Sequence, residues 1–450
     1  MSVKSLWHRF REALEVTRSD SRCAHDARLV KRKHEVEFSE ISRTIDVTMN
    51  VLVLNCGSSS VKFQVIETGA GGERKRLSGI VDEIGARAVL RVDYLDGAPA
   101  TDEKHALADH EAAIRLIVER LGLATAATSR RFPIDAVGHR VVHGGNLFAS
   151  AVLIDDAVLG QIESLNELAP LHNPVAVSGI HAMRKILGAR VPMVAAFDTS
   201  FHQTIPPTAA LYAIPRELSE KHAIRRYGFH GLAHQFSLLR YCELSGIPAE
   251  QINLVTLHLG NGCSACAIRA GRSVDTSMGF TPLEGLVMGT RSGDLDPALV
   301  SYLAREENVD AAEVENWLNK RSGLLGLSGI SNDMRELLAI YDRDPRARVA
   351  VDLFCYRARK YLGAYLAALG GAQAVIFSGG IGENAPAVRE KICAGMEWCG
   401  LILEGKNNAA AVGVEARVSV PGARLAAYVI PSDEAAIIAR ETARLSLTPI

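Results

Sequence analysis

The sequence predicts an α/β protein that contains two copies of one domain. From residue 49 onward, short apolar runs alternate with longer helical patterns, which is typical of layered α/β folds. The chain has 450 residues, and a typical domain of about 150 residues suggests two or three domains. A strand–turn–strand pattern at 51–65 recurs at 254–268. This recurrence indicates a duplicated unit.

Each predicted element follows from its local pattern. Short runs of β-branched and other apolar residues predict strands at 51–54, 61–66, 136–142, 193–196, 254–259, 263–268, 374–378 and 426–430. Apolar residues spaced three and four apart predict helices at 109–121, 155–168, 174–187, 231–244, 297–306, 310–320, 344–369, 385–397 and 432–445.

Composition excludes several classes of protein. The 50 basic and 51 acidic residues nearly cancel, so the chain has no global charge that would attract nucleic acid or an anionic membrane. No apolar run approaches the roughly 18 residues that a membrane span needs. Eight cysteines are too few for a disulfide scaffold, and we expect reduced thiols in a cytoplasmic protein. Cys263 and Cys266 have CxxC spacing, but we expect them to be core residues of a strand.

Residues 1–48 differ from the rest of the chain. They carry ten Lys/Arg and eight Asp/Glu, with no apolar segment typical of a secretion signal. We expect a disordered or loosely helical extension, or upstream translation from a start that should be Met49. A partner-binding arm is the alternative.

Four polar clusters follow predicted strands or lie in glycine-bounded loops. Arg140 lies in Gly138-His-Arg-Val-Val-His-Gly-Gly, Asp198 follows the strand at 193–196, and His230 begins a helix. His230 and His234 are also spaced as a zinc pair, although no HExxH motif accompanies them. Arg291 lies in a loop with two aspartates, so it either forms a local salt bridge or binds an anion.

A glycine-rich turn at 379–385 leaves a second interpretation open. It follows a predicted strand and has the GxGxxA spacing of a dinucleotide fingerprint, with Glu404 about 20 residues further on. An NAD-dependent dehydrogenase is therefore an alternative. The chain beyond this turn is too short for a complete doubly wound sheet, and such a turn can equally hold an adenosine or phosphate group at a helix N-terminus.

Taken together, the motifs resemble the acetate/propionate kinase family from about residue 49 to 442. The segments that carry this resemblance include Asn-Cys-Gly-Ser-Ser-Ser-Val-Lys at 55–62, Phe-Asp-Thr-Ser-Phe-His at 197–202, Arg-Tyr-Gly-Phe-His-Gly at 226–231, His-Leu-Gly-Asn-Gly at 258–262 and Met-Gly-Thr-Arg-Ser-Gly-Asp at 288–294. The resemblance implies two duplicated actin/ribonuclease H-like domains around an ATP cleft. It also implies reversible phosphoryl transfer from ATP to acetate by direct in-line attack, with propionate as the rival substrate.

The resemblance also implies a division of the chain. We predict an N-terminal domain at 49–198, to which the helix within 432–450 returns, and a C-terminal nucleotide-binding domain at 199–431. It implies Mg²⁺, for which Mn²⁺ can substitute, a homodimer, and ATP and acetate as substrates, with no nucleic acid or membrane partner. A catalytically silent nucleotide-binding sensor is a further alternative, which an intact set of catalytic residues disfavours.

Individual roles follow from the same resemblance. Asp198, His230 and Arg291 would be catalytic, and Asn55 and Glu434 would hold the metal. Acetate would be bound by Arg140, Val142, Leu171, Phe229 and Pro282. ATP would be bound by Lys62, His258, Leu259, Gly260, Asn261, Gly262, Asp333, Met334, Arg335, Gly380, Ile381, Gly382, Glu383 and Asn384.

The pocket and two departures from the family pattern qualify these roles. Val142 favours acetate, since a smaller residue would leave room for another methylene. The usual His-Gly-Thr-Ser-His reads His-Gly-Leu-Ala-His at 230–234, and Pro-Thr-Asn-Glu-Glu reads Pro-Ser-Asp-Glu-Ala at 431–435. Two hydroxyls beside His230 and one acidic neighbour of Glu434 are therefore absent. Glu434 also suits the first turn of a helix for purely structural reasons.

Overall fold

The computed structural model describes residues 47–448 except 86, 96–99, 123–132 and 171. The predicted extension at 1–48 therefore lies outside the described residues, except for its last two positions. In the part of the chain that is described, no helix is both long and apolar enough to cross a membrane.

Fourteen strands are described along the chain. They are β1 (Met49–Cys56), β2 (Val61–Gly69), β3 (Gly72–Asp82), β4 (Arg87–Tyr94), β5 (Thr101–Ala106), β6 (Ala136–Val141), β7 (Val152–Leu153), β8 (Met193–Phe197), β9 (Asn253–Leu259), β10 (Cys263–Arg269), β11 (Arg272–Thr276), β12 (Ala374–Ser378), β13 (Ala416–Arg417) and β14 (Ala426–Val429). All eight predicted strands are among them.

The described helices separate these strands. The longer ones are α3 (His110–Arg120), α4 (Asp156–Ser164), α5 (Asn173–Leu187), α8 (Gly231–Ser245), α9 (Ala298–Glu306), α10 (Ala311–Lys320), α13 (Pro345–Leu369), α15 (Pro386–Cys393) and α17 (Glu434–Leu447). The shorter ones are α6 (Pro207–Ala210), α7 (Arg216–Lys221), α11 (Gly323–Ser328), α12 (Met334–Ala339), α14 (Gly379–Asn384), α16 (Gly405–Ala410) and the 3₁₀ turns η1 (Gly188–Arg190), η2 (Ser200–Thr204), η3 (Ala249–Gln251) and η4 (Glu397–Cys399).

The strands form two sheets that repeat one topology. The first has the order β5-β4-β3-β2-β1-β6-β8-β7, and the second has the order β11-β10-β9-β12-β14-β13. β1 pairs antiparallel with β2 and parallel with β6, just as β9 pairs antiparallel with β10 and parallel with β12. A further parallel strand follows in each sheet, β8 in the first and β14 in the second. The predicted duplicated α/β fold is thereby confirmed.

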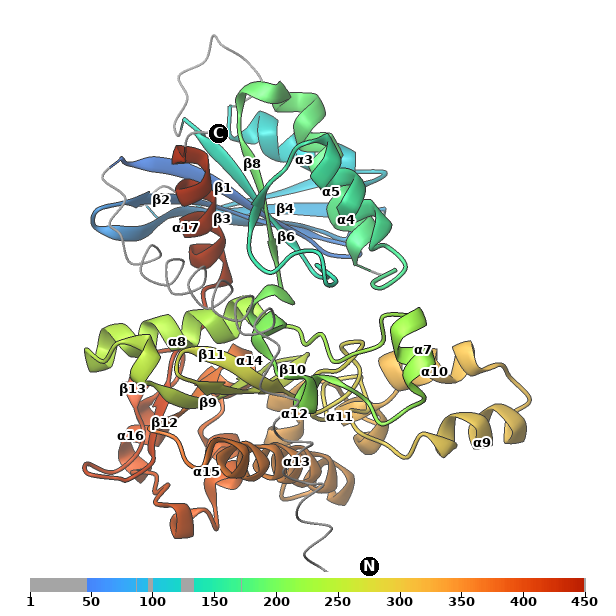
Figure 1. The fold of residues 1–450 in the computed structure, drawn as a ribbon, viewed down its shortest axis with the longest axis vertical. Coiled ribbons are helices and arrows are strands. Elements are labelled where there is room, and N and C mark those ends of the chain that lie inside the picture. Colours follow the sequence, from blue (N-terminus) through green and yellow to red (C-terminus); the bar gives the residue numbers. More distant parts are fainter. Residues whose placement is uncertain (1–46, 86, 96–99, 123–132, 171, 449–450) are drawn as a thin grey trace, which may run out of the picture. The chain divides into compact units, whose positions relative to one another are not determined.

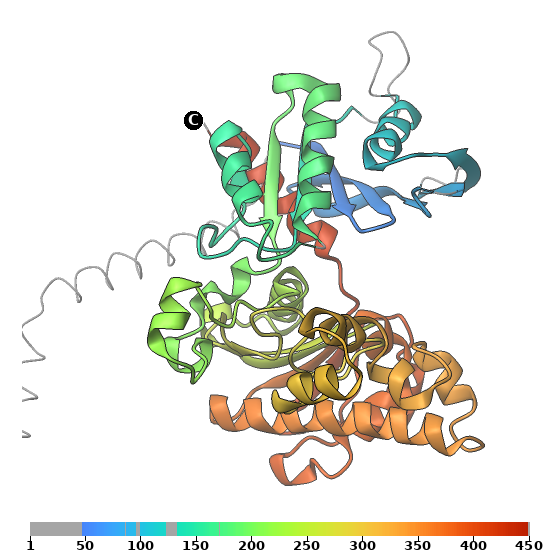
Figure 2. The same cartoon turned by 90° about the vertical axis from the view of Figure 1, so that its right-hand side faces the viewer.

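Helices cover both faces of each sheet. α3, α4 and α5 pack on one face of the first sheet, and the C-terminal helix α17 packs on β1, β6 and β8 from the other face (Figure 1). In the second sheet, α8 packs on β9 and β12, whereas α13 packs on β9 and β10 from the opposite face (Figure 2). The last helix of the chain therefore packs on the first sheet. The domain boundary at residue 198 stays a prediction.

Six of the described strands were not predicted: β3, β4, β5, β7, β11 and β13. Among them, β3 and β5 carry little apolar signal, and β7 and β13 are only two residues long. β5 reads Thr-Asp-Glu-Lys-His-Ala, and its side chains alternate between half-buried and exposed at the edge of the sheet. β3 and β4 are likewise rich in charged residues and pair antiparallel. Two predicted helices are shorter than expected. α4 ends at Ser164, and α15 ends at Cys393, just before Gly395 takes a positive φ of 76°.

Candidate active site

Three of the predicted site residues lie where parallel strands of the first sheet end. Asn55 is the penultimate residue of β1, Arg140 is the penultimate residue of β6, and Asp198 directly follows β8. Because β1, β6 and β8 run parallel, their carboxyl ends meet at one edge of the sheet. The sequence motifs at these positions are thereby brought together although they are far apart along the chain.

Arg140 is held between two carboxylates at this edge. Its Nε and Nη2 donate to Asp198 Oδ1 and Oδ2 at 2.8 and 2.6 Å, and its Nη1 lies 3.3 Å from Glu434 Oε2. Burial lowers the pKa of Arg140, but the charges of Asp198 and Glu434 outweigh that effect and raise it. Burial raises the pKa of Asp198, and the two bonds from Arg140 oppose the rise. The forked contact is geometrically specific and fixes the plane of the guanidinium.

Glu434 reaches this site from the far end of the chain. It is the first residue of α17, and Asp433 caps that helix by accepting from Ala436 N at 3.1 Å. A carboxylate in the first turn is favoured by the helix dipole, so Glu434 also stabilises the start of α17. Asp433 stands where the family usually has asparagine, and it can still cap the helix because aspartate and asparagine are both good caps.

The second sheet supplies the other predicted groups from the equivalent edge. His258 is near the end of β9, and its Nδ1 lies 3.2 Å from the hydroxyl of Ser378, the last residue of the parallel strand β12. α14 begins at Gly379 immediately after β12. Gly379 has a φ of 75°, and a Cβ there would lie 2.7 Å from the Leu259 carbonyl oxygen, so only glycine allows this close approach.

His230 occupies a strained position at the start of α8. Its φ of 57° and ψ of 23° lie in the left-handed region, which non-glycine residues seldom adopt. The next amide, Gly231 N, donates to the Asp198 carbonyl at 2.8 Å, and a side chain on Gly231 would overlap that carbonyl. Burial, and then the nearby positive and histidine groups, hold the pKa of His230 well below its usual value. The ring is therefore neutral at pH 7.

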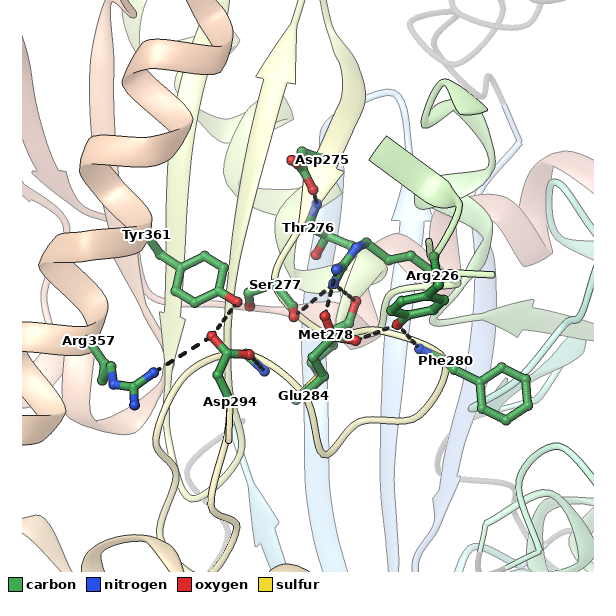
Figure 3. A network of polar contacts seen from close by, with 12 residues as sticks. Arg226, Asp275, Thr276, Ser277, Met278, Phe280, Glu284, Asp294, Arg357 and Tyr361 are labelled. Atoms are coloured by element: carbon green, nitrogen blue, oxygen red, sulfur yellow. Dashed lines mark hydrogen bonds and ion pairs between the residues drawn. The ribbon is translucent and has the colours of Figure 1, made fainter. Parts of the chain in front are cut away.

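The loop that carries Pro282 and Arg291 is fixed by a polar network (Figure 3). Arg226 donates to Glu284 at 2.6 Å, and the Tyr212 hydroxyl donates to the other oxygen of Glu284. In the same loop, the contacts of Asp294 are the Tyr361 hydroxyl at 2.8 Å, the amide of Gly285 at 2.9 Å and Arg357 at 3.9 Å.

This network explains why Arg291 has no carboxylate partner among the described residues. Asp294, which could have formed a local salt bridge, already has the partners given above. Arg291 Nη1 instead donates to the Pro282 carbonyl at 3.2 Å. A Cβ on Gly262 would lie 3.7 Å from Arg291 Nη1 and 3.5 Å from His230 Nε2. The two side chains thus approach the same glycine, and no carboxylate of the described residues pairs with Arg291.

Two adjoining cavities are lined by half of the residues predicted for the site. One, of about 240 Å³, is lined by Asn55, Cys56, Gly57, Ser60, Lys62, Arg140, Val142, His172, Asp198, Phe229, His230, Pro282 and Arg291. The other, of about 360 Å³, is lined by Val53, Asn55, Lys62, Phe63, Gln64, Lys75, Arg140, His258, Gly379, Gly380, Ser432, Asp433, Glu434, Ala435 and Ile438. The first joins cationic groups to an apolar wall, which suits a small carboxylate with a methyl group. Leu171 lies outside the described residues.

Several residues predicted to bind ATP line neither of these two cavities. Met334 is buried in the core of the second sheet's domain, and the Arg335 side chain is largely exposed and paired with Asp333, the cap of α12. Glu383 uses its carboxylate inside the protein, where Oε1 accepts from Gly379 N at 2.7 Å and Ser432 N at 3.0 Å. Glu383 thus ties the start of α14 to the segment that leads to α17.

Sequence reasoning missed His172, which lines the smaller cavity. Burial, followed by the nearby charge of Arg291, lowers its pKa. It stands next to Leu171 in the Ala-Pro-Leu-His-Asn-Pro segment at 169–174, so that motif contained the signal. Lys75 and Ser432 of the larger cavity were missed as well. Lys75 lies on β3, a strand without a clear sequence pattern.

The donor set fits Mg²⁺ only if phosphate oxygens complete it. No group of three or more His, Cys, Asp or Glu side chains suited to a metal occurs among the described residues. Asn55 and Glu434 line the same cavity and offer oxygen atoms, and Glu434 Oε2 lies 3.3 Å from Arg140 Nη1. Mg²⁺ characteristically takes one or two protein oxygens together with water and substrate phosphates. His234 is not a zinc ligand here, since both of its ring nitrogens contact hydroxyl groups.

Comparison with known proteins identifies the family. A sequence model described as the Acetokinase family matches residues 50–440. This chain belongs to that family. It is 49% identical over 413 residues to an acetate kinase of Chloroherpeton thalassium, covering 88% of this chain and 99% of that protein. An acetate kinase of Solibacter usitatus is 50% identical over 409 residues, with 89% and 99% covered.

Solved structures agree with this assignment. A crystal structure of Porphyromonas gingivalis acetate kinase superposes with a TM-score of 0.82 at 39% identity, covering 88% of this chain and 99% of that one. A propionate kinase from Francisella tularensis superposes with a TM-score of 0.81 at 36% identity, with 88% and 100% covered. The two scores are so close that the fold alone does not discriminate between the two acids.

Proposed function

We propose that this chain is an acetate kinase, which transfers the γ-phosphoryl group of ATP to acetate and yields acetyl phosphate and ADP. The observation that carries the proposal is the smaller cavity. There the cationic Arg140 and Arg291 and the neutral His230 stand beside the apolar side chains of Val142 and Phe229. A site that neutralises a carboxylate and a phosphoryl group together, and buries a methyl group, is what this reaction requires.

Acetate would be bound by Arg140. Asp198 uses Nε and one N–H of Nη2, which leaves further N–H groups of Nη1 and Nη2 as donors for the substrate. Because acetate is already ionised at pH 7, its oxygen needs no general base to attack phosphorus. We therefore assign Asp198 the task of orienting Arg140. Val142 would limit the space beside the methyl group and favour acetate over propionate.

The transfer step would join an acetate oxygen to the γ-phosphorus as the bond from that phosphorus to the bridging oxygen of ADP breaks. The bonding electrons leave with ADP, and no proton is gained or lost. Arg291, which has no carboxylate partner in the part of the chain that is described, and His230 would donate hydrogen bonds to the equatorial phosphoryl oxygens. Both stabilise charge that is spread over those oxygens in the transition state.

The larger cavity would hold the nucleotide phosphates. Lys62, His258 and Gly380 line it, and the turn 260–262 connects β9 to β10 beside it. We propose that Asn55 and Glu434 hold Mg²⁺, or Mn²⁺ in its place. When bound, the ion would neutralise charge on the phosphates.

Hydroxylamine trapping tests the proposal. The protein is incubated with ATP, Mg²⁺ and either formate, acetate, propionate or butyrate, and acyl phosphate is captured as the hydroxamate. We expect the highest kcat/KM with acetate and a lower value with propionate. If propionate gives the higher value, the enzyme is a propionate kinase. If no acid gives a hydroxamate although ATP binds, the chain is a silent nucleotide sensor, and NADH binding without ATP turnover would indicate the dehydrogenase.

We also propose that the protein is a homodimer and that it is located in the cytoplasm. A homodimer is tested by analytical ultracentrifugation of the full chain, where a monomer at micromolar concentration would contradict it. A cytoplasmic location is supported by the free cysteines of the described chain and is tested by cell fractionation.

A further inference from the structure

Three buried side chains lie in a row behind His230, and none of the three takes part in the mechanism described above. His230 Nδ1 lies 3.0 Å from the Ser264 hydroxyl, which lies 2.8 Å from His234 Nε2. His234 Nδ1 in turn lies 2.7 Å from the Thr256 hydroxyl. Ser264, His234 and Thr256 are all fully buried. Thr256 and Ser264 belong to the neighbouring strands β9 and β10, and both histidines belong to the start of α8.

The protons that His230 and these three side chains carry allow only one direction for the hydrogen bonds between them. Thr256 has no other hydrogen-bond partner among the described residues, so its O–H must donate to His234 Nδ1 or remain unsatisfied in the core. His234 is neutral, because burial holds its pKa well below the usual value. A neutral imidazole that accepts at Nδ1 carries its proton on Nε2. His234 therefore donates to Ser264.

Ser264 continues the same direction of hydrogen-bond donation to His230. A hydroxyl has one proton, and Ser264 already accepts from His234, so its own O–H is left for His230 Nδ1. His230 is also neutral, and it must then carry its proton on Nε2. That nitrogen has no partner among the described residues and lies near Gly262, beside Arg291 Nη1. The row thus presents an N–H donor, rather than a lone pair, to the smaller cavity.

We propose that Ser264 is a positioning residue that sets the tautomer and ring orientation of His230, and that His234 and Thr256 set the polarity of Ser264. The relevance to turnover rests on the proposed kinase function, since an N–H at Nε2 stabilises phosphoryl oxygens whereas a lone pair repels them. The row also gives a physical role to His234, the second histidine of the segment 230–234 that differs from the usual family pattern. Its replaced neighbours Leu232 and Ala233 are buried and contribute no polar group to the row.

The first experiment measures the tautomers directly and needs no enzyme activity. Nitrogen-15 histidine is incorporated into the full chain, and long-range proton–nitrogen correlation spectra are recorded without substrate; His230→Gln and His234→Gln variants assign the two rings. We expect both rings to be neutral and protonated at Nε2. Protonation of either ring at Nδ1 overturns the proposal. Because this readout is independent of turnover, a failure of the kinase proposal would leave it unaffected.

The second experiment removes the links one at a time. Ser264→Ala should lower kcat about 10–100-fold, as is typical when the partner that orients a functional imidazole is lost, with both KM values within about twofold. The His230 Nδ1 resonance should move toward that of a nitrogen without a hydrogen bond. Thr256→Val breaks the row at its far end, so it should move the His234 Nδ1 resonance and lower kcat less.

A matched control separates positioning from packing. Ser237 is a buried serine on α8 whose hydroxyl donates to the Ala233 carbonyl at 3.0 Å, outside the row. Ser237→Ala should leave kcat and both histidine spectra unchanged. The proposal is overturned if Ser264→Ala leaves kcat and the His230 resonances unchanged. It is equally overturned if Ser237→Ala lowers kcat as much as Ser264→Ala does.

Discussion

The packing of α17 against β6 provides a test of how the site is assembled. Gly138, on β6, faces the helix, and a Cβ at this position would lie 2.5 Å from Ile438 Cγ2 and 2.6 Å from Thr442 Oγ1. Both side chains are buried, so neither can turn away into solvent. Ordinary contact begins near 3.4 Å, so Gly138→Ala forces α17 outward by about 1 Å. The backbone conformation of a strand accepts alanine, which leaves this displacement as the main effect.

The displacement matters because α17 begins at Glu434. A shift of about 1 Å in a positioning group can cost about 100-fold in rate, and overpacking of this kind costs about 1–3 kcal/mol of stability. We therefore expect Gly138→Ala to lower kcat by about 10–100-fold and to raise the Mg²⁺ concentration for half-maximal rate. Gly138 does not line either cavity, so no substrate contact is lost.

The assay is hydroxamate formation across a Mg²⁺ titration, at a temperature where circular dichroism shows both proteins folded. Gly160→Ala is the control, since Gly160 is an exposed position of α4 with no atom within 4 Å of the added Cβ. It should keep full activity and gain about 0.5–1 kcal/mol of helix stability. A folded Gly138→Ala protein with an unchanged kcat and Mg²⁺ dependence would show that α17 does not position Glu434.

Three further predictions concern charge and burial. Arg291→Ala should lower kcat about 1,000-fold while ATP affinity, measured by calorimetry, changes only a few-fold; an equal loss of both would make the residue structural. Arg389 donates five hydrogen bonds, four of them buried, to Gly382, Glu383, Asn408 and Ala411. Arg389→Ala should therefore lower the free energy of unfolding by about 3–5 kcal/mol in thermal unfolding, and the exposed control Arg216→Ala should change it by almost nothing. Burial lowers the pKa of His139 to about 3 and that of His258 to about 4, so the unfolded chain binds more protons than the folded one below about pH 6.5. The free energy of unfolding should have its full value above that pH and fall by up to about 1.4 kcal/mol per pH unit for each histidine toward pH 5. Unfolding midpoints that stay flat or rise on acidification would contradict this.

Much of the site could be predicted because it lies at the ends of strands with strong apolar signals. Asn55, Arg140, Asp198 and His258 each stand at or directly beyond the last residues of a buried parallel strand. An apolar run that stops at a polar residue is a local pattern, and the parallel arrangement then places those residues at one edge. β3 and β5 could not be predicted in the same way. These strands form through backbone hydrogen bonds to neighbouring strands, and their own side chains carry little apolar signal.

Partner choice within the site could not be read from the sequence. Arg291 has two aspartates within five positions, yet Asp294 contacts Tyr361 and Arg357 of α13 instead. Glu383 lies in a segment expected to bind nucleotide, yet its carboxylate binds two backbone amides. Both outcomes depend on residues about 50–70 positions away along the chain, and a hydrogen bond forms only where donor and acceptor are within about 3 Å.

The duplicated α/β fold, the order of its motifs and the family could be predicted from the amino-acid sequence. They follow from local apolar periodicity and from residues that stand close together in the chain. Packing is what makes Asp198 and Glu434 share Arg140, leaves Arg291 without a carboxylate partner among the described residues, and joins His230 to His234 through Ser264. The physical reason is that charge pairing and proton direction depend on distances of a few ångströms, which are set only when distant strands and helices pack against one another.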